Sequence, residues 1–434
     1  MIEDITLYAF LFISGALLAS FLGDLIYRIT RIPNILWLML IGFILGPYLG
    51  ILDPVEMREI QPIVGPLALA LVFFNAGLVL DIFKFFLRSF RPLFFSFVVV
   101  AFTMVGVAIV AKAIFGWDYL MGATLGAVFG GTGTAIVMPL SKKLLLPEEV
   151  NQFLTVEGAV TGVLAVVLTA ALTDALVFGT ADLQSAGVAI ALSLGKGLLL
   201  GFVVGIGWMM VLYLLQDLEY SSMITLAVNF LVYAGSDYIG GNGPLSALVF
   251  GMVMGNNPSL AKMLKLKHTP LPTEKIKGFQ EEIMFFLQAF FFIYLGSLIN
   301  LGSEKTLLIS GILVLVILVA RIFATFVSTV AAGQLSYYRL ILSIMFARGL
   351  KSAVLSTLPL TIVHGYMKTH AYIPQLYPLA YTFRQFPDIV FIVIGLSIIL
   401  TTVLATLWSI THGPRREKHP VAQPKIIHEE ESLE

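Results

Sequence analysis

Long apolar runs make up most of the chain, and polar residues gather in the short stretches between them. A helix that crosses a lipid bilayer needs about 20 mostly apolar residues. By this measure the pattern predicts thirteen membrane-spanning helices, at about residues 5–27, 33–50, 62–83, 92–115, 119–140, 152–173, 186–215, 220–238, 243–256, 281–300, 306–331, 338–362 and 389–411. The ninth run is short, and glycine or charged residues interrupt the fifth and the twelfth. The pattern therefore predicts an all-α polytopic membrane protein.

The basic residues between the runs test this count independently, because Lys and Arg gather in the cytoplasmic loops of membrane proteins. If the N-terminus is outside and the runs alternate, most of the 26 basic residues fall in inner segments. The outer segments then hold few of them, namely Arg58, Lys305, Lys368 and Arg384. One helix more or fewer would spoil this asymmetry. The sequence therefore predicts residence in the cell (cytoplasmic) membrane, with an outer N-terminus and a cytoplasmic C-terminus.

The runs divide the chain into one long membrane domain and a tail. Residues 1–411 are predicted to form the transmembrane domain, whose halves (about 5–173 and 220–411) flank a linking helix at 186–215. Residues 412–434 are rich in charge and proline, and are predicted to form a disordered cytoplasmic tail. The stretch between His364 and Asp388 is predicted to be an outer loop lying along the membrane interface.

Three segments of the first half resemble three segments of the second half, in the same order. The pairs are Trp37–Pro47 with Leu245–Asn256, Leu71–Asp81 with Ala289–Leu301, and Leu125–Leu140 with Leu342–Leu360. Apolar helices resemble one another by composition alone, but three ordered pairs favour a repeat. The offset is seven spans, an odd number, so the two halves are predicted to be inverted. Inverted repeats with broken helices are typical of secondary transporters.

The interrupted fifth and twelfth runs are the predicted site. Glycine lets the backbone leave the helix, and the freed carbonyls and neighbouring hydroxyls become ligands. The pattern predicts two crossed discontinuous helices with a site between them near the midplane. The predicted crossing glycines are Gly130, Gly131, Gly133 and Gly349, and the residues beside them are Thr132, Thr134, Arg348 and Lys351.

Composition narrows the function classes. Only 12% of the residues are charged, against about a quarter in soluble domains, and 58% are hydrophobic. The net charge is zero, so no basic face for nucleic acid is expected. The chain has no cysteine, and its six histidines lie in loops or the tail, so no metal is expected beyond a transported cation. The sequence has no Walker motif and no hydrolase motif, so we expect that the protein is not an enzyme and has no cofactor.

Three strings connect the chain with a known family. They are FF-x-AGL-x-LD at Phe73–Asp81, GSDYIGGNGPLSALVFGMVMGN at Gly235–Asn256 and FARGLKSAVL at Phe346–Leu355. Over roughly residues 5–411 the chain resembles the monovalent cation/proton antiporters, the superfamily of sodium/proton exchangers. The resemblance implies a six-helix core that contains the crossed fifth and twelfth helices, beside a panel that forms a homodimer. It also implies elevator-like alternating access.

One departure from that family affects the ion site. The resemblance implies an Asp in the sixth helix, preceded by Asn or Asp, that binds the cation and carries the proton. Aligning Glu157–Leu168 with the family places Thr161 and Gly162 at this pair, so the usual carboxylate is missing. At the fifth-helix crossing, some members have Thr-Asp-Pro where this chain has Thr132, Gly133 and Thr134.

The charged residues within the predicted spans are functional candidates, since charges at membrane depth are costly. The resemblance implies that Glu157 and Arg321 pair across the core, either as a structural ion pair or with Glu157 as the titrating ion ligand. Arg348 and Lys351 either compensate the carbonyl ends of half-helices or favour an anion.

The function predicted is exchange of Na⁺ or K⁺ for H⁺, with monovalent cation, proton and bilayer as partners. The ion site would comprise Glu157, Thr132, Thr134, Thr161 and Gly162. Two alternatives remain open: the same fold with an anion or small organic acid as substrate, bound by Arg348 or Lys351, and a non-transporting sensor.

Overall fold

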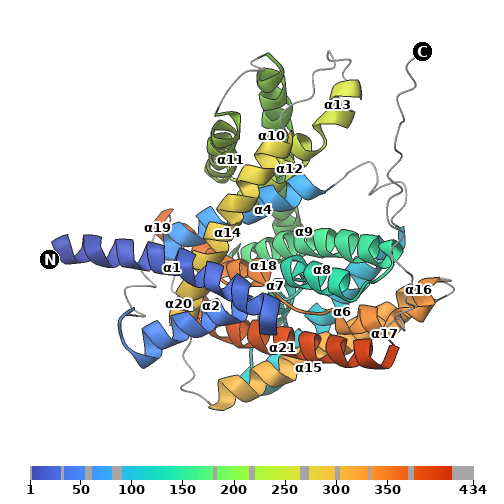
Figure 1. Cartoon of the computed structure of the whole chain (residues 1–434). Coiled ribbons are helices and arrows are strands. Elements are labelled where there is room, and N and C mark those ends of the chain that lie inside the picture. Colours follow the sequence, from blue (N-terminus) through green and yellow to red (C-terminus); the bar gives the residue numbers. More distant parts are fainter. Residues whose placement is uncertain are drawn as a thin grey trace, which may run out of the picture.

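The computed structural model describes residues 2–30, 34–53, 61–80, 90–178, 183–214, 220–263, 273–298, 304–330, 334–369 and 376–412. Within these ranges the ordered elements are helices and no strand occurs (Figure 1). This agrees with the predicted all-α class. The predicted tail lies outside the described residues, apart from His412, which ends the last helix.

The first half and the linking helix comprise α1 (Ile2–Thr30), α2 (Asn34–Phe43) continued by η1 (Ile44–Tyr48), α4 (Gln61–Val79), α6 (Phe90–Phe115), α7 (Tyr119–Val128), α8 (Thr134–Lys143), α9 (Glu148–Phe178) and α10 (Leu183–Leu214). The second half comprises α11 (Ser221–Tyr238), α12 (Gly243–Gly255), α13 (Asn257–Met263), α14 (Thr273–Ser297), α15 (Glu304–Ser328), α16 (Gln334–Tyr337), α17 (Arg339–Ile344), α18 (Leu350–Leu355), α19 (Leu358–Thr369), α20 (Leu376–Phe383) and α21 (Phe386–His412).

The helices occupy the positions that the apolar runs predict. By length and composition, five segments of the described chain can cross a membrane: Phe90–Phe115, Glu148–Val177, Ala191–Leu214, Thr306–Ser328 and Leu376–Thr411. Shorter apolar helices occupy most of the other predicted spans. The number of thirteen crossings stays a prediction.

The two predicted interruptions are present. The fifth run breaks after α7 and resumes as α8, and the twelfth breaks after α17 and resumes as α18. The two breaks meet, because the Gly133 amide donates a hydrogen bond to the Ala347 carbonyl at 2.8 Å. This contact joins the halves of the chain at the crossing that the glycines predict.

The predicted outer loop between His364 and Asp388 is wrong for the described residues. Helix α19 continues to Thr369, α20 covers Leu376–Phe383, and α21 already begins at Phe386. The reason is burial: Phe383 and Phe386 are fully buried and pack edge to face, with ring centroids 5.1 Å apart. Aromatic side chains that suggest an interfacial loop in sequence are here packed as helix.

Close glycine contacts relate the two halves. Gly42 in α2 faces Gly296 in α14, and a Cβ added at Gly42 would lie 2.9 Å from the Gly296 Cα. Gly251 in α12 faces Gly77 in α4 in the same way, with 3.2 Å from an added Cβ to the Gly77 Cα. Four residues further, Gly46 meets Ser297 and Gly255 meets Leu78.

These contacts are equivalent under the predicted repeat. The second and third runs of the first half correspond to the ninth and tenth of the second half. Replacing each helix by its counterpart therefore turns the contact of α2 with α14 into the contact of α12 with α4. A two-fold repeat, inverted or parallel, requires such an exchange, and similarity between unrelated apolar helices does not produce it.

The helices form two groups, which Figure 1 shows at different heights. Around the crossing, α6 packs on α7 and α15, α7 packs on α9, and α15 packs on α21. In the second group α12 packs on α4, α10 and α11. A separate hydrophobic cluster that includes Phe74, Met209 and Phe250 lies inside this second group.

Candidate functional site

The backbone between α7 and α8 forms one side of the site. The Gly130 amide donates to the Ala127 carbonyl at 2.8 Å, which closes the last turn of α7, and the chain then leaves the helix until Thr134. A Cβ at Gly133 would lie 3.0 Å from the Ala347 carbonyl oxygen and 3.1 Å from the Gly349 nitrogen. Glycine at position 133 therefore permits the two breaks to touch, and Gly131 faces Gly162 beside them.

Glu157 and Arg321 form a fully buried ion pair across the site. The Arg321 Nη1 and Nη2 atoms each lie 2.9 Å from one carboxylate oxygen of Glu157. Arg321 Nε also donates to the Leu342 carbonyl at 2.8 Å, where α17 ends, and the guanidinium lies over the Phe95 ring. This two-pronged pairing is the strong form of the Arg–carboxylate interaction. It joins α9 to α15 and to the second break.

The Thr132 hydroxyl lies at the centre of the buried charges. It donates to Glu157 Oε1 at 2.5 Å and accepts from Arg321 Nη1 at 3.3 Å and Arg348 Nη1 at 3.4 Å. The Thr132 amide donates to the Thr161 hydroxyl at 3.3 Å, and that hydroxyl donates to the Glu157 carbonyl at 2.8 Å. Two residues on, Thr134 begins α8 and places its methyl group against Gly158.

Arg348 is fully buried where the twelfth run breaks. Its amide donates to the Ser397 hydroxyl in α21 at 3.0 Å, and its Nη1 to the Gly130 carbonyl at 3.4 Å. That carbonyl lies just past the end of α7, where the helix dipole is negative. Nε and Nη2 have no hydrogen-bond partner among the described residues. The arrangement supports the interpretation that Arg348 compensates the carbonyl end of a half-helix.

Lys351 points from α18 toward α9. Its Nζ donates to the Gly158 carbonyl at 2.8 Å. A Cβ added at Gly162 would lie 3.0 Å from this Nζ and 3.2 Å from Cδ. The lysine thus fills the space that the absent side chain at position 162 leaves.

All the predicted site residues converge at the crossing, and three partners were missed. The carbonyls of Gly158 and Leu342 and the hydroxyl of Ser397 take part, and none of these three groups was predicted for the site. Gly158 had a signal, since it lies four residues before Gly162 and so on the same helix face. Backbone carbonyls such as that of Leu342, and one serine among many, carry no such signal.

The site contains three basic side chains and one carboxylate. Arg321, Arg348 and Glu157 are fully buried, and Lys351 extends among them. Burying charge is costly unless each charge is paired or hydrogen-bonded, and here carbonyls, hydroxyls and the carboxylate share that role. The donor set available to a ligand comprises oxygens: threonine hydroxyls, freed carbonyls and the Glu157 carboxylate.

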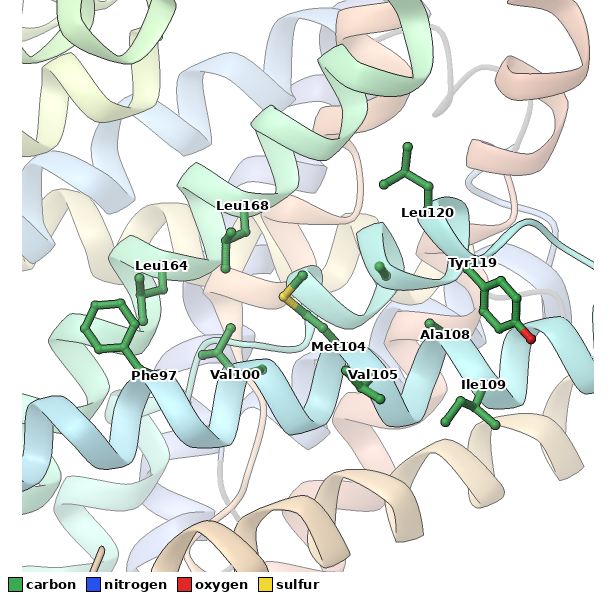
Figure 2. A pocket seen from close by; sticks show the side chains of 12 residues that line it. Phe97, Val100, Met104, Val105, Ala108, Ile109, Tyr119, Leu120, Leu164 and Leu168 are labelled. Carbon is green, nitrogen blue, oxygen red and sulfur yellow. The ribbon is translucent and has the colours of Figure 1, made fainter. Parts of the chain in front are cut away.

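A second candidate, an apolar groove of about 710 Å³, is not an ion site. It lies between α6, α7 and α9, and Figure 2 shows its lining side chains. They are hydrocarbon side chains, one thioether and the phenol of Tyr119, so no carboxylate or amide oxygen is offered. Phe97, Val105 and Ile109 on its wall are more than half exposed, as is expected of residues that face lipid.

Comparison with known proteins bears on the family and the fold of the chain. The family model described as "Sodium/hydrogen exchanger, transmembrane" matches residues 13–410. The K(+)/H(+) antiporter NhaP2 of Shewanella sp. (strain MR-4) is 29% identical over 258 residues, which are 57% of this chain and 44% of that protein. The chain thus covers less than half the length of this relative.

Two further matches extend over most of the chain. The Na(+)/H(+) antiporter 1 of Methanocaldococcus jannaschii is 22% identical over 408 residues, which are 90% of this chain and 92% of that protein. The solved structure of the sodium proton antiporter MjNhaP1 from the same organism, at pH 8, has a TM-score of 0.75 and 19% identity. The matched region covers 93% of this chain and 99% of the MjNhaP1 chain, so the two proteins share a fold.

Proposed function

Because the chain belongs to the sodium/hydrogen exchanger family, we propose that it exchanges a monovalent cation, Na⁺ or K⁺, for a proton by alternating access. It is a multi-pass membrane protein. The observation that carries the proposal is the crossing of two broken helices at Gly133 and Ala347, with buried charges and hydroxyls around it. Broken helices at the repeat interface are where secondary transporters bind their substrate and coupling ion.

The ligands for the cation would be oxygens at this crossing. Thr132, Thr134 and Thr161 supply hydroxyls, and the breaks supply carbonyls. Both Glu157 oxygens accept from Arg321, and one also accepts from Thr132. That engagement supports a structural role for the pair, because Glu157 would have to leave Arg321 before it could bind an ion or a proton.

The two helix groups supply the moving parts. The group around the crossing would carry the ion past the group built on α4, α10, α11 and α12, in an elevator-like motion. We propose a homodimer in the cytoplasmic membrane, with the N-terminus outside and the C-terminus in the cytoplasm. The excess of basic residues in the predicted inner segments supports this orientation.

The proposal is tested by proton flux. The purified full chain is reconstituted in vesicles that contain a pH dye, and pulses of Na⁺, K⁺ and Li⁺ are compared with empty vesicles on either side of neutral pH. A pH change that depends on protein and on one of the cations is the expected result. A flat trace with every cation would overturn exchange as the function.

Two other functions are less well supported. An anion or small organic acid would require free basic groups. Lys351 already donates to the Gly158 carbonyl, so among the basic groups of the described site only Nε and Nη2 of Arg348 are without a partner. The relatives are cation/proton antiporters by name, which does not favour an anion carrier or a sensor without transport. Uptake of labelled carboxylates by the same vesicles, without any cation-driven pH change, would favour the anion carrier.

A further inference from the structure

Lys351 places an ammonium group inside the crossing, against the backbone of α9. Its Nζ lies 2.8 Å from the Gly158 carbonyl oxygen. The space around it exists because position 162 has no side chain, since a Cβ there would lie 3.0 Å from Nζ. Gly131 faces both residues, with an added Cβ 3.7 Å from the Gly162 Cα and 3.8 Å from the Lys351 Cβ. Two glycines and one carbonyl thus border the positive charge of a half-buried side chain.

A protonated amine and a monovalent metal ion are stabilised by the same kind of ligand. Each carries one positive charge and is satisfied by uncharged oxygens such as carbonyls and hydroxyls. The Gly158 carbonyl holds the amine, and Thr161, one turn further along α9, brings its hydroxyl to the amide of Thr132. The ammonium therefore binds the same stretch of α9 that carries the Thr161 hydroxyl, one of the oxygens to which the exchanged cation is assigned.

The charges that act on Lys351 come from few elements. Glu157 on α9 is the carboxylate whose charge acts on it, and Arg348 lies on its own segment. Helix α18 also packs on α4, α14, α19 and α21. Helix α19 has its ionisable residues, His364, Tyr366 and Lys368, in its second half. Helix α4 carries no ionisable residue; α14 brings the buried Tyr294 and charged residues near its start, and α21 has ionisable groups only near its ends, Asp388 and His412.

We propose that the Lys351 ammonium occupies the cation position as a tethered substitute, and that Lys351 carries the proton that is exchanged. This rests on the proposed cation/proton exchange and specifies its carrier. In the step, one N–H bond of the ammonium breaks, the electron pair stays on nitrogen, and the proton passes to water on the side that the site faces. A monovalent cation then takes the place of the ammonium at the Gly158 carbonyl.

This exchange leaves the charge of the site unchanged. One positive charge leaves as a proton when one enters as the cation, so both loaded forms of the moving group carry the same charge. The Glu157–Arg321 pair stays intact throughout. The proposal therefore predicts electroneutral exchange of one proton for one cation. A lysine amine suits this role because it releases its proton in buried sites, whereas a guanidinium does not.

The test compares Lys351→Met with the parent protein in vesicles. Two fluxes are measured: proton flux driven by a cation pulse, and exchange of labelled for unlabelled Na⁺ or Rb⁺ across the membrane at constant pH. Lys351→Met empties the cation position and removes the proton carrier. Loss of the proton flux to the level of empty vesicles, with cation-for-cation exchange retained, is the expected result. Cation/proton exchange by the parent protein is also expected to be unaffected by an imposed membrane potential.

Other outcomes overturn the inference or its premise separately. If Lys351→Met keeps cation-driven proton flux, or if the folded variant loses both fluxes, Lys351 does not carry the proton. Parent exchange that is driven by the membrane potential also overturns it. No flux in the parent with any cation would instead overturn the proposed function itself.

Two further variants protect the test against misfolding. Lys351→Arg keeps a positive charge that does not leave at neutral pH, so both fluxes are expected to be lost while the melting temperature stays near that of the parent. Parental flux in Lys351→Arg would overturn the proposal. Lys196→Met is the matched control, because Lys196 Nζ also donates to a backbone carbonyl, that of Ile239 at 2.9 Å, but lies in α10. It is expected to leave both fluxes unchanged.

Discussion

The Thr132 hydroxyl connects segments that are far apart in the sequence. It touches Glu157 on α9, Arg321 on α15 and Arg348 at the second break. One hydroxyl thus donates to the carboxylate and accepts from both guanidinium groups. A buried polar group that loses its partner pays the full cost of desolvation, which makes this position sensitive to small changes.

Replacing Thr132 by valine is expected to destabilise the protein by about 1–3 kcal/mol, because Arg348 and Glu157 lose a buried partner while the volume is kept. Thermal unfolding of the purified protein in detergent measures the change. Thr132→Ser keeps the hydroxyl and is expected to stay close to the parent. Thr103→Val is the matched control: Thr103 is fully buried, but its hydroxyl has no partner among the described residues. Equal destabilisation by both valine variants would contradict the assigned role.

The Glu157–Arg321 pair predicts a coupled response to substitution. Glu157→Gln leaves a buried guanidinium without its counter-charge, which is expected to cost about 3–5 kcal/mol. Arg321→Gln leaves the carboxylate unpaired, with a cost of the same order. The double variant carries neither charge and is expected to be more stable than either single variant, as a double-mutant cycle would show. If a stable double variant loses all proton flux while the Lys351 variants keep it, Glu157 is the carrier.

The sequence located the residues of the site better than it located their partners. Clustered glycines and charged residues are unfavourable within a membrane-spanning helix. Their presence in a predicted span therefore indicates a structural or functional role. The ion pair was expected from the resemblance. The contact of Lys351 with Gly158 was not expected, because it depends on how α18 and α9 approach each other after the chain breaks. Periodicity within one helix does not contain that information.

At the scale of elements, glycine sets how closely helices approach. The crossings of α2 with α14 and of α12 with α4 each bring backbone against backbone. Close approach through small residues is a main source of helix association within a membrane, where burying apolar surface against protein rather than lipid gains little. The paired glycines therefore fix the geometry of both halves.

Gly42→Ala and Gly251→Ala are expected to destabilise the protein by similar amounts, since the repeat makes the two positions equivalent. Each added methyl group would overlap backbone of the facing helix, and such overpacking typically costs about 1–3 kcal/mol. Thermal unfolding in detergent measures both. Gly207→Ala and Gly395→Ala are controls, because a Cβ at either meets no atom within 4 Å. Alanine favours helix, so these controls are expected to be neutral or slightly stabilising. Unequal effects at positions 42 and 251 would argue against the symmetry.

Helix type was easy to predict, whereas helix ends and loops were not. The apolar runs located the long helices, and glycines located both breaks. The error fell between His364 and Asp388, where prolines and aromatic residues suggested a loop and the chain forms helix. The packing of Phe386 on Phe383 and Trp117 decides that segment. Trp117 lies in a distant turn, so the local sequence does not show this contact.

At the scale of the whole molecule, the predicted orientation of the two termini requires that each of the thirteen predicted spans crosses the membrane. The shortest predicted span, residues 243–256, corresponds to α12, which has 13 residues. At about 1.5 Å per residue it spans about 20 Å, less than the hydrocarbon thickness of about 30 Å. Most of α12 is buried against α4, α10 and α11, so it is shielded from lipid. Helix α13 follows it directly and adds length.

Labelling of single cysteines is expected to show that α12 and α13 together cross the membrane. The chain has no cysteine, so each introduced thiol is the one that reacts. Tyr238 at the end of α11 is 92% exposed, and Lys262 in α13 is also exposed. A membrane-impermeant maleimide added to whole cells is expected to label Tyr238→Cys, and to label Lys262→Cys only after the membrane is opened. Asp118→Cys and Lys142→Cys flank the α7–α8 segment as an outer and an inner reference.

If Tyr238→Cys and Lys262→Cys react from the same side, α12 is a re-entrant segment, the thirteen-span count fails, and every later segment changes sides. The inner excess of Lys and Arg would then be lost in the second half, so the labelling pattern and the charge distribution test the same arrangement.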